Sequence, residues 1–142
     1  MTLSHPGVAV TVGIVGASVL VLLARRHTRD REVLAYAIGL GITGIAYLLF
    51  GLALGAPRDH LARELVGAVV FGGAAVVGAR GRAGLLALGW TAHVLWDLFF
   101  HYAGGPDFAP AWYAMFCVGF DLPVGGYIAG SMAGLRRTDP ST

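Results

Sequence analysis

The sequence has little charge and almost no cysteine. Only 13% of its 142 residues are charged, whereas soluble domains carry about 25% charged residues. All ten basic residues are arginine, and lysine is absent. Because Cys117 is the single cysteine, an intrachain disulfide is excluded. This composition does not predict a soluble globular domain or a fold held together by disulfides.

Apolar residues, by contrast, are abundant. Hydrophobic residues make up 56% of the chain, and the mean hydropathy is +0.71. Five stretches approach the roughly 20 apolar residues with which a helix crosses a hydrocarbon core of about 30 Å. The segments between them are short and rich in charge, glycine or proline, as loops between antiparallel neighbours should be. We predict one all-α integral membrane domain over residues 1–142, a bundle of five transmembrane helices at about 7–24, 33–56, 61–79, 83–103 and 110–135.

The positions of the arginines predict the orientation of the bundle. If the N-terminus lies outside, only Arg58 and Arg63 lie on the outer side. The cytoplasmic segments then hold the other arginines, which are Arg25, Arg26, Arg29, Arg31, Arg80, Arg82, Arg136 and Arg137. Such an excess in short loops indicates the cytoplasmic side. We therefore predict a multi-pass protein of the bacterial plasma membrane, N-terminus outside and C-terminus cytoplasmic. Because topology accounts for the arginines, no nucleic-acid partner is predicted.

Small residues at helical spacing predict close helix packing. Gly126, Gly130 and Gly134 form a GxxxGxxxG series in the last helix, and Ala68 and Gly72 form a similar pair in the third. Helices associate in lipid through such small residues because the backbones can approach closely. We expect both faces to pack within the chain, with a homodimer through the glycine series as the alternative.

The stretch HVLWDLFFH, residues 93–101, places three polar side chains inside the fourth apolar run. His93, Asp97 and His101 are four residues apart and advance about 40° per step, so an α-helix presents them on one face. Trp90 falls within the same arc. Insertion scales assign about 2.5–3.5 kcal/mol to an aspartate at the centre of a membrane helix, and such residues usually serve a function.

The neighbouring helices add polar groups at matching depths. Antiparallel packing brings Asp121 to the level of His93 and Cys117 to the level of Asp97. Glu64, near the start of the third helix, lies near the level of His101. We predict that these side chains line one cavity in the outer half of the bundle.

We assign acid–base roles to His93, Asp97 and Asp121, because buried imidazole and carboxyl groups suit proton transfer near neutral pH. The residues that we assign to substrate binding line the same predicted cavity and are Glu64, Trp90, Trp96, His101 and Cys117. The alternative for each residue is structural: a hydrogen-bonded carboxyl group, a packed aromatic ring or a packed thiol.

Three functions are consistent with this group. The leading hypothesis is the binding or acid–base transformation of a lipophilic small molecule, such as the isomerisation or cyclisation of an isoprenoid-like substrate, without a cofactor. The alternative is a metal-binding membrane protein or metal-dependent membrane hydrolase, with zinc or iron held by ligands from His93, Asp97, His101 and Asp121. His93 and His101 lie about 12 Å apart along an α-helix, so one ion does not easily take both. The third is a non-catalytic structural or partner-binding protein.

The stretch GWTAHVLWDLFFHYAGGP, residues 89–106, resembles the signature of an uncharacterised family of small bacterial multi-spanning membrane proteins. The signature is Gly-Trp, a histidine three residues later, and then Trp-Asp, here Gly89, Trp90, His93, Trp96 and Asp97. A cysteine four residues before an aspartate in the last helix is matched by Cys117 and Asp121.

Two departures from this family concern the metal hypothesis. Phe100 and Phe120 stand where the family often has a second histidine and a second cysteine, which weakens that hypothesis. The family carries no known activity, so the resemblance supports the site and leaves the reaction unnamed. The spacing of a histidine and an acid four residues later is also similar to that in sterol isomerases of the emopamil-binding type.

Overall fold

The computed structural model describes residues 5–103 and 108–137, with side chains through residue 131. Within these ranges the chain is helical and has no strand, which confirms the all-α prediction. The elements are α1 (Pro6–Ala24), α2 (Arg29–Leu54), α3 (Arg58–Ala79), α4 (Ala83–Trp96), the π-helix η1 (Asp97–Tyr102) and α5 (Ala111–Arg137).

Two helices begin earlier than their apolar runs predict. α2 starts at Arg29 and α3 at Arg58, where we expected starts near 33 and 61. Polar residues form the extra turn in each case, with Asp30 and Glu32 in the first turn of α2 and Asp59 in that of α3. Acidic side chains are favourable there because a helix N-terminus carries partial positive charge. Hydropathy marks the segment that lipid can cover and not the full length of the helix.

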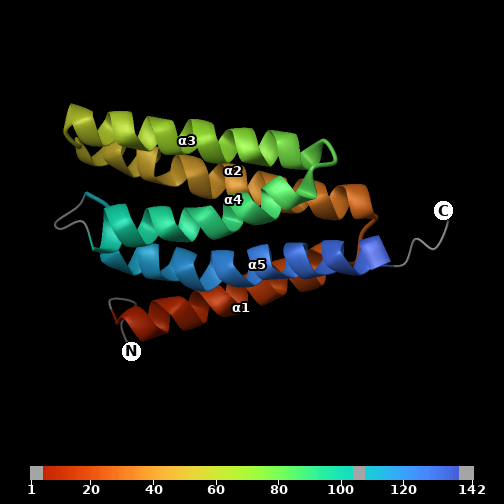
Figure 1. Cartoon of the computed structure of the whole chain (residues 1–142). Coiled ribbons are helices and arrows are strands. Elements are labelled where there is room, and N and C mark those ends of the chain that lie inside the picture. Colours follow the sequence, from red (N-terminus) through yellow and green to blue (C-terminus); the bar gives the residue numbers. More distant parts are fainter. Residues whose placement is uncertain (1–4, 104–107, 138–142) are drawn as a thin grey trace.

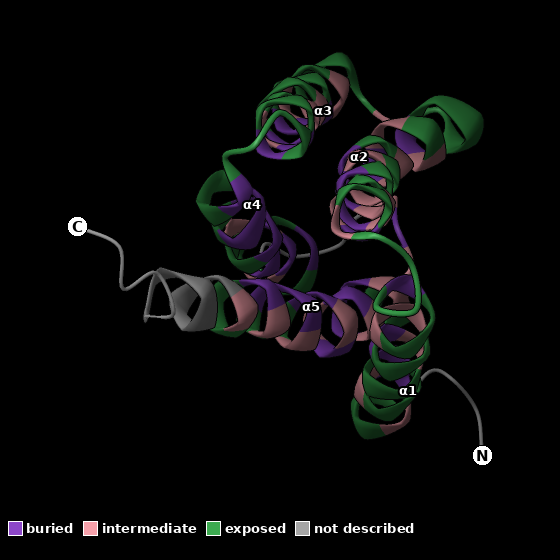
Figure 2. Ribbon diagram, turned by 90° about the vertical axis from the view of Figure 1, so that its right-hand side faces the viewer, coloured by how far each residue is buried: buried purple, intermediate pink, exposed green. Residues whose placement is uncertain are grey.

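The helices pack side by side as one bundle (Figure 1). α1 packs against α5, α5 against α4, α4 against α3, and α3 against α2. The start of α1 and the end of α5 lie at opposite ends of the bundle. Seen end-on, buried residues face neighbouring helices and exposed ones face outward (Figure 2). The exposed residues include large apolar side chains such as Ile42, Leu49 and Val69, which a bilayer would solvate.

Four helical segments are long and apolar enough to cross a membrane: Pro6–Ala24, Arg29–Leu54, Arg58–Ala79 and Ala83–Tyr102. These match the first four predicted spans. The fifth predicted span forms α5, whose 27 residues correspond to about 40 Å of helix. That α5 also crosses the membrane stays a prediction.

The closest helix contact joins α1 to α5, backbone to backbone. A Cβ atom added to Gly13 would overlap the carbonyl oxygen of Phe116, and one added to Gly119 would overlap that of Val10. Backbone atoms cannot move aside as a flexible side chain can. Glycine is therefore required at both positions for this approach.

The predicted small-residue faces lie differently from our expectation. Gly126 and Gly130 are exposed, and no atom of the described residues comes within 4 Å of a Cβ added to either. The expected packing of these two glycines within the chain is therefore wrong, and Gly134 lies outside the residues whose side chains are described. The buried glycine of this segment is Gly125, whose added Cβ would lie 2.9 Å from Thr91 Oγ1.

The same offset occurs on α3. Ala68 is only half-buried, and Gly72 has nothing within 4 Å of an added Cβ. Gly67, one residue earlier, provides the close contact, because an added Cβ would lie 2.9 Å from the Trp96 ring. Small residues thus do lie at the helix contacts. They occur where a large side chain of the neighbouring helix packs against the backbone, as Trp96 does at Gly67.

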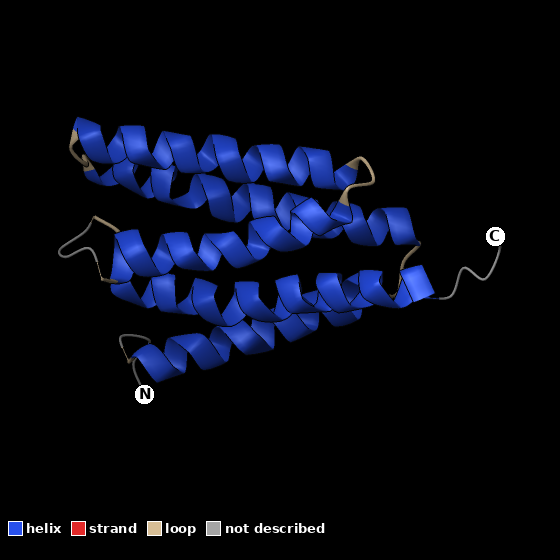
Figure 3. Ribbon diagram, viewed as in Figure 1, coloured by secondary structure: helices blue, strands red, loops and turns tan. Residues whose placement is uncertain are grey.

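The fourth predicted span changes its helical geometry at Asp97. The α-helical part ends at Trp96, and a π-helix continues from Asp97 to Tyr102. In this segment the Ala103 amide donates to the Leu98 carbonyl, five residues back, at 2.9 Å. A π-turn holds more residues than an α-turn and is often found at functional sites. Side chains after Asp97 therefore do not continue the face that an α-helix predicts. Figure 3 shows that the ribbon nevertheless stays helical throughout this part.

Candidate functional site

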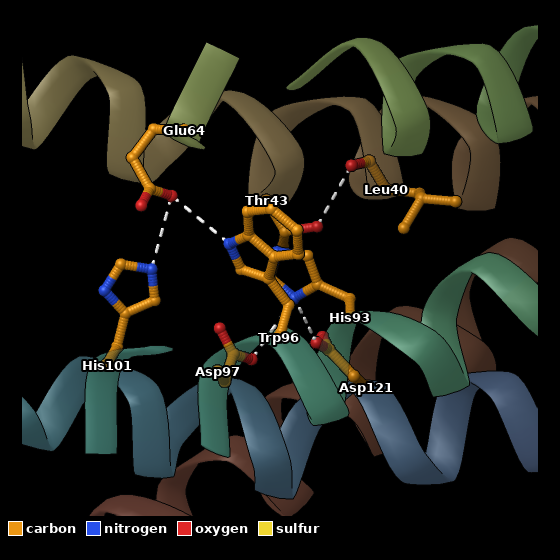
Figure 4. A network of polar contacts seen from close by, with 8 residues as sticks. All are labelled: Leu40, Thr43, Glu64, His93, Trp96, Asp97, His101 and Asp121. Atoms are coloured by element: carbon orange, nitrogen blue, oxygen red, sulfur yellow. Dashed lines mark hydrogen bonds and ion pairs between the residues drawn. The ribbon is translucent and has the colours of Figure 1, made fainter. Parts of the chain in front are cut away.

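His93, Asp97 and Asp121 meet in the interior of the bundle (Figure 4). His93 Nδ1 lies 2.8 Å from Asp121 Oδ2 and 3.2 Å from Asp97 Oδ2. All three side chains are buried, with at most 1% of their surface exposed. α4 supplies the histidine, η1 the first aspartate and α5 the second. His93 and Asp121 thus lie at the same level, as the antiparallel packing predicts. We call these three residues the His93 cluster.

The His93 cluster has more acceptors than donors. A single imidazole nitrogen, Nδ1, faces both carboxyl groups, and it can take part in one hydrogen bond, which it shares with Asp121. In the described part of the chain, both oxygens of Asp97 and Oδ1 of Asp121 have no hydrogen-bond partner. Unpaired charge is costly in a buried place. The cluster therefore requires extra protons or a bound cation.

The arrangement suits a metal ion. One ligand atom from each residue of the His93 cluster lies within 4.8 Å of the others. An imidazole nitrogen with two carboxylate oxygens is a donor set that zinc and iron accept. His101, which the metal hypothesis also considered, does not belong to this group. It lies within η1 and contacts Glu64 on α3 instead.

Glu64 is the centre of a second buried cluster. Arg63 Nε donates to its Oε1 at 2.7 Å, and Trp96 Nε1 donates to its Oε2 at 3.2 Å. His101 Nε2 lies 3.3 Å from the same Oε2. We call Arg63, Glu64, Trp96 and His101 the Glu64 cluster. The polar residues predicted to line one cavity are therefore divided between two neighbouring groups (Figure 4).

Tyr47 of α2 lies between the two clusters, and the sequence analysis missed it. Its ring stacks on that of His101, with centroids 3.5 Å apart and 1° between the planes. Its hydroxyl lies close enough to Asp97 to interact with that carboxyl group, but no described residue meets the geometry of a hydrogen bond to it. The available signal was a phenol in the middle of an apolar run, where its hydroxyl requires a partner.

Cys117 and Trp90 are both fully buried. The Cys117 thiol interacts electrostatically with Asp97 and Asp121, although it is outside the group of close ligand atoms. The Trp90 ring packs on that of Phe120, 5.8 Å away between centroids, and against the backbone of Gly39. Trp90 thus fills the core beside the site, whereas Cys117 lies close enough to both aspartates to interact with them electrostatically.

A fourth buried carboxylate, that of Glu32, lies at the opposite end of the bundle. Glu32 Oε1 accepts hydrogen bonds from Tyr36 at 3.1 Å and Tyr127 at 3.0 Å, and Arg29 Nη1 lies 3.3 Å from Oε2. Both oxygens of Glu32 have a partner, whereas those of Asp97 form no hydrogen bond with the described residues. Full pairing is typical of a structural carboxylate.

Fold and site together define an all-α protein with four membrane-length helices and a buried group of one histidine and two aspartates. The chain belongs to DUF6010, a family of unknown function, whose model matches residues 8–134. This match extends from α1 into α5, well beyond the stretch that carries the resemblance noted in the sequence. None of the curated proteins and none of the solved structures matches the chain.

Proposed function

We propose that this protein is a multi-pass membrane protein that binds one divalent transition-metal ion, zinc or iron, through His93, Asp97 and Asp121. The observation that carries the proposal is a pair of fully buried carboxylates that face one imidazole nitrogen, three of whose four oxygens accept no hydrogen bond from the described residues. A divalent cation with two ionised carboxylates and a neutral histidine makes an uncharged group. Such a group avoids the cost of net charge in an apolar interior.

The donor set also indicates a class of chemistry. Catalytic zinc sites use three protein ligands and leave a fourth position for water or substrate. When bound here, the ion would supply Lewis acidity and an activated water, as in hydrolases. The protein's own contribution would be to orient the three ligands and to keep the surroundings apolar. A metal-dependent membrane hydrolase is the enzyme class that fits this arrangement.

We further propose that all five predicted spans cross the plasma membrane, with the N-terminus outside. The arginines support this topology, because eight lie at one end of the bundle and only Arg58 and Arg63 at the other. The His93 cluster would then lie toward the outer half of the membrane, with the Glu64 cluster above it.

The test is metal analysis of the protein purified gently in detergent. The wild type should contain close to one zinc or iron per chain, whereas His93→Ala and Asp121→Asn should lose it. His27→Ala is the control, because His27 is exposed and lies in the loop between α1 and α2. A wild type that folds but takes up neither metal on reconstitution would overturn the proposal.

A second candidate function uses the same residues without a metal. Apolar and aromatic rings surround His93, with Phe71 4.7 Å and Tyr47 6.3 Å away between ring centroids. A histidine that shares protons with two carboxyl groups in such surroundings suits acid–base work on a lipophilic, isoprenoid-like molecule. Glu64, Trp90, Trp96, His101 and Cys117 would then contact the substrate.

The same purified sample separates the two functions. Mass spectrometry of co-extracted small molecules should detect an apolar ligand if the second function is correct, in the absence of stoichiometric metal. The ligand should be lost in Asp97→Asn. Metal without such a ligand would favour the first function.

A further inference from the structure

Glu64 interacts with three hydrogen-bond donors, none of which belongs to the His93 cluster. The carboxylate is 2% exposed, and its partners are Arg63, Trp96 and His101. Arg63 comes from the same helix, whereas the other two come from the end of α4 and from η1. Hydrogen bonds to an ionised carboxylate are stronger than neutral ones. Glu64 thus ties α3 firmly to the segment around the π-turn.

The two partners on that segment bracket Asp97. Trp96 immediately precedes Asp97, and His101 is the fifth residue of η1. Asp97 itself makes no hydrogen bond within the described residues. His93 Nδ1 lies 3.2 Å from one of its oxygens, so the direction of the Asp97 side chain depends on this contact and on the backbone of the π-helix that carries it. Glu64 holds this stretch of backbone through Trp96, one residue before Asp97, and His101, four residues after it.

Packing supports the same arrangement. The Trp96 ring lies over Gly67, where an added Cβ would come within 2.9 Å of it, and edge-on to Phe71 with centroids 5.8 Å apart. On the other side, Tyr47 stacks on His101. A π-turn is rare compared with an α-turn. It therefore needs contacts from neighbouring helices to stabilise it. α2 and α3 both contribute contacts that fix this one.

We propose that Glu64 is a positioning residue, which holds the π-turn so that the Asp97 carboxylate points at the metal site. The inference rests on the proposed metal-binding function. Removing a residue that orients a metal ligand without touching the metal typically lowers metal affinity by about 10- to 100-fold.

Glu64→Gln is the direct test, because glutamine has nearly the same size and can still accept from Trp96. Zinc affinity should fall by about 10- to 100-fold. The absorption spectrum of the Co²⁺-substituted protein should also change, because that spectrum reports the ligand geometry around the ion. Trp96→Phe, which removes one hydrogen bond but keeps a ring, should cause a smaller change in the same direction and guards against misfolding of the first variant.

Glu32→Gln is the matched control. It removes the charge of another buried glutamate with three partners, but at the far end of the bundle. It should lower thermal stability about as much as Glu64→Gln does while leaving zinc affinity and the Co²⁺ spectrum as in the wild type.

The outcomes separate the inference from the function on which it rests. Wild-type zinc affinity and an unchanged Co²⁺ spectrum in Glu64→Gln would overturn the positioning role and leave the metal site standing. Equal losses of affinity in Glu64→Gln and Glu32→Gln would overturn it too, since general loosening would explain both. A wild-type protein that binds neither zinc nor Co²⁺ would overturn the metal site and the positioning role together.

Discussion

At the scale of single residues, Tyr47 shows how stacking and hydrogen bonding contribute differently to the site. Its ring is 1% exposed and stacks on His101, while its hydroxyl has no hydrogen-bond partner among the described residues. The ring should therefore account for most of what the Tyr47 side chain contributes to the free energy of unfolding. A buried hydroxyl without a partner contributes little or is unfavourable.

Two substitutions of Tyr47 should separate these contributions. Tyr47→Phe keeps the ring and should change the free energy of unfolding by less than about 1 kcal/mol. Tyr47→Ala leaves a cavity beside His101 and should destabilise the protein by about 3–5 kcal/mol. Unfolding in mixed micelles measures both. A large loss of stability in Tyr47→Phe would instead mean that the hydroxyl makes a strong bond in the folded protein.

The sequence predicted some of these residues and not others, for a physical reason. His93, Asp97 and Asp121 meet because helical spacing and antiparallel packing fix their levels, and both can be derived from the sequence. The contact of His101 with Glu64 depends on the π-turn, which no hydrophobic pattern reveals. An α-helix would have kept His101 on the face of His93 and Asp97. Tyr47 stacks where it does because of that same turn.

At the scale of the elements, the contact between α1 and α5 depends on two glycines. Neither Gly13 nor Gly119 belongs to the GxxxGxxxG series that stands out in the sequence. That series faces outward at Gly126 and Gly130. A glycine pattern therefore predicted that α5 makes close contacts but not through which face, because the position of Asp121 in the core sets the rotation of the helix.

Alanine substitutions should distinguish the two glycine faces of α5. Gly119→Ala places a methyl group against the Val10 carbonyl and should lower stability by about 1–3 kcal/mol or more. Gly13→Ala should do the same from α1. Gly126→Ala is the control on the same helix and should be nearly neutral in the monomer. Thermal unfolding in detergent measures all three, and equal effects at 119 and 126 would contradict this contact.

At the scale of the whole molecule, the distribution of arginine distinguishes the two ends of the bundle. The end with Arg58 and Arg63 holds the Glu64 cluster, and the arginine-rich end holds Glu32. The number and order of the helices followed from hydropathy alone. The orientation in the membrane stays a prediction, as does a homodimer through the exposed glycine face.

Fusions at the C-terminus test this orientation. Green fluorescent protein fused there should fluoresce, because it folds in the cytoplasm, and alkaline phosphatase fused there should be inactive. Reversing the arginine asymmetry should reverse both signals in part of the population. An active phosphatase fusion on the unaltered chain would place the C-terminus outside.

The pairing of α1 with α5 has a consequence for how the chain is made. The ribosome delivers α1 first and α5 last, and at about 5–20 residues per second several seconds separate them. α1 contacts its sequence neighbour α2 far less than it contacts α5. In the proposed membrane topology, the glycine surface of α1 would rest against lipid or the insertion machinery during that interval. Assembly is therefore completed only after translation of the last helix, so nascent chains stalled before α5 should be preferred substrates of membrane quality-control proteases.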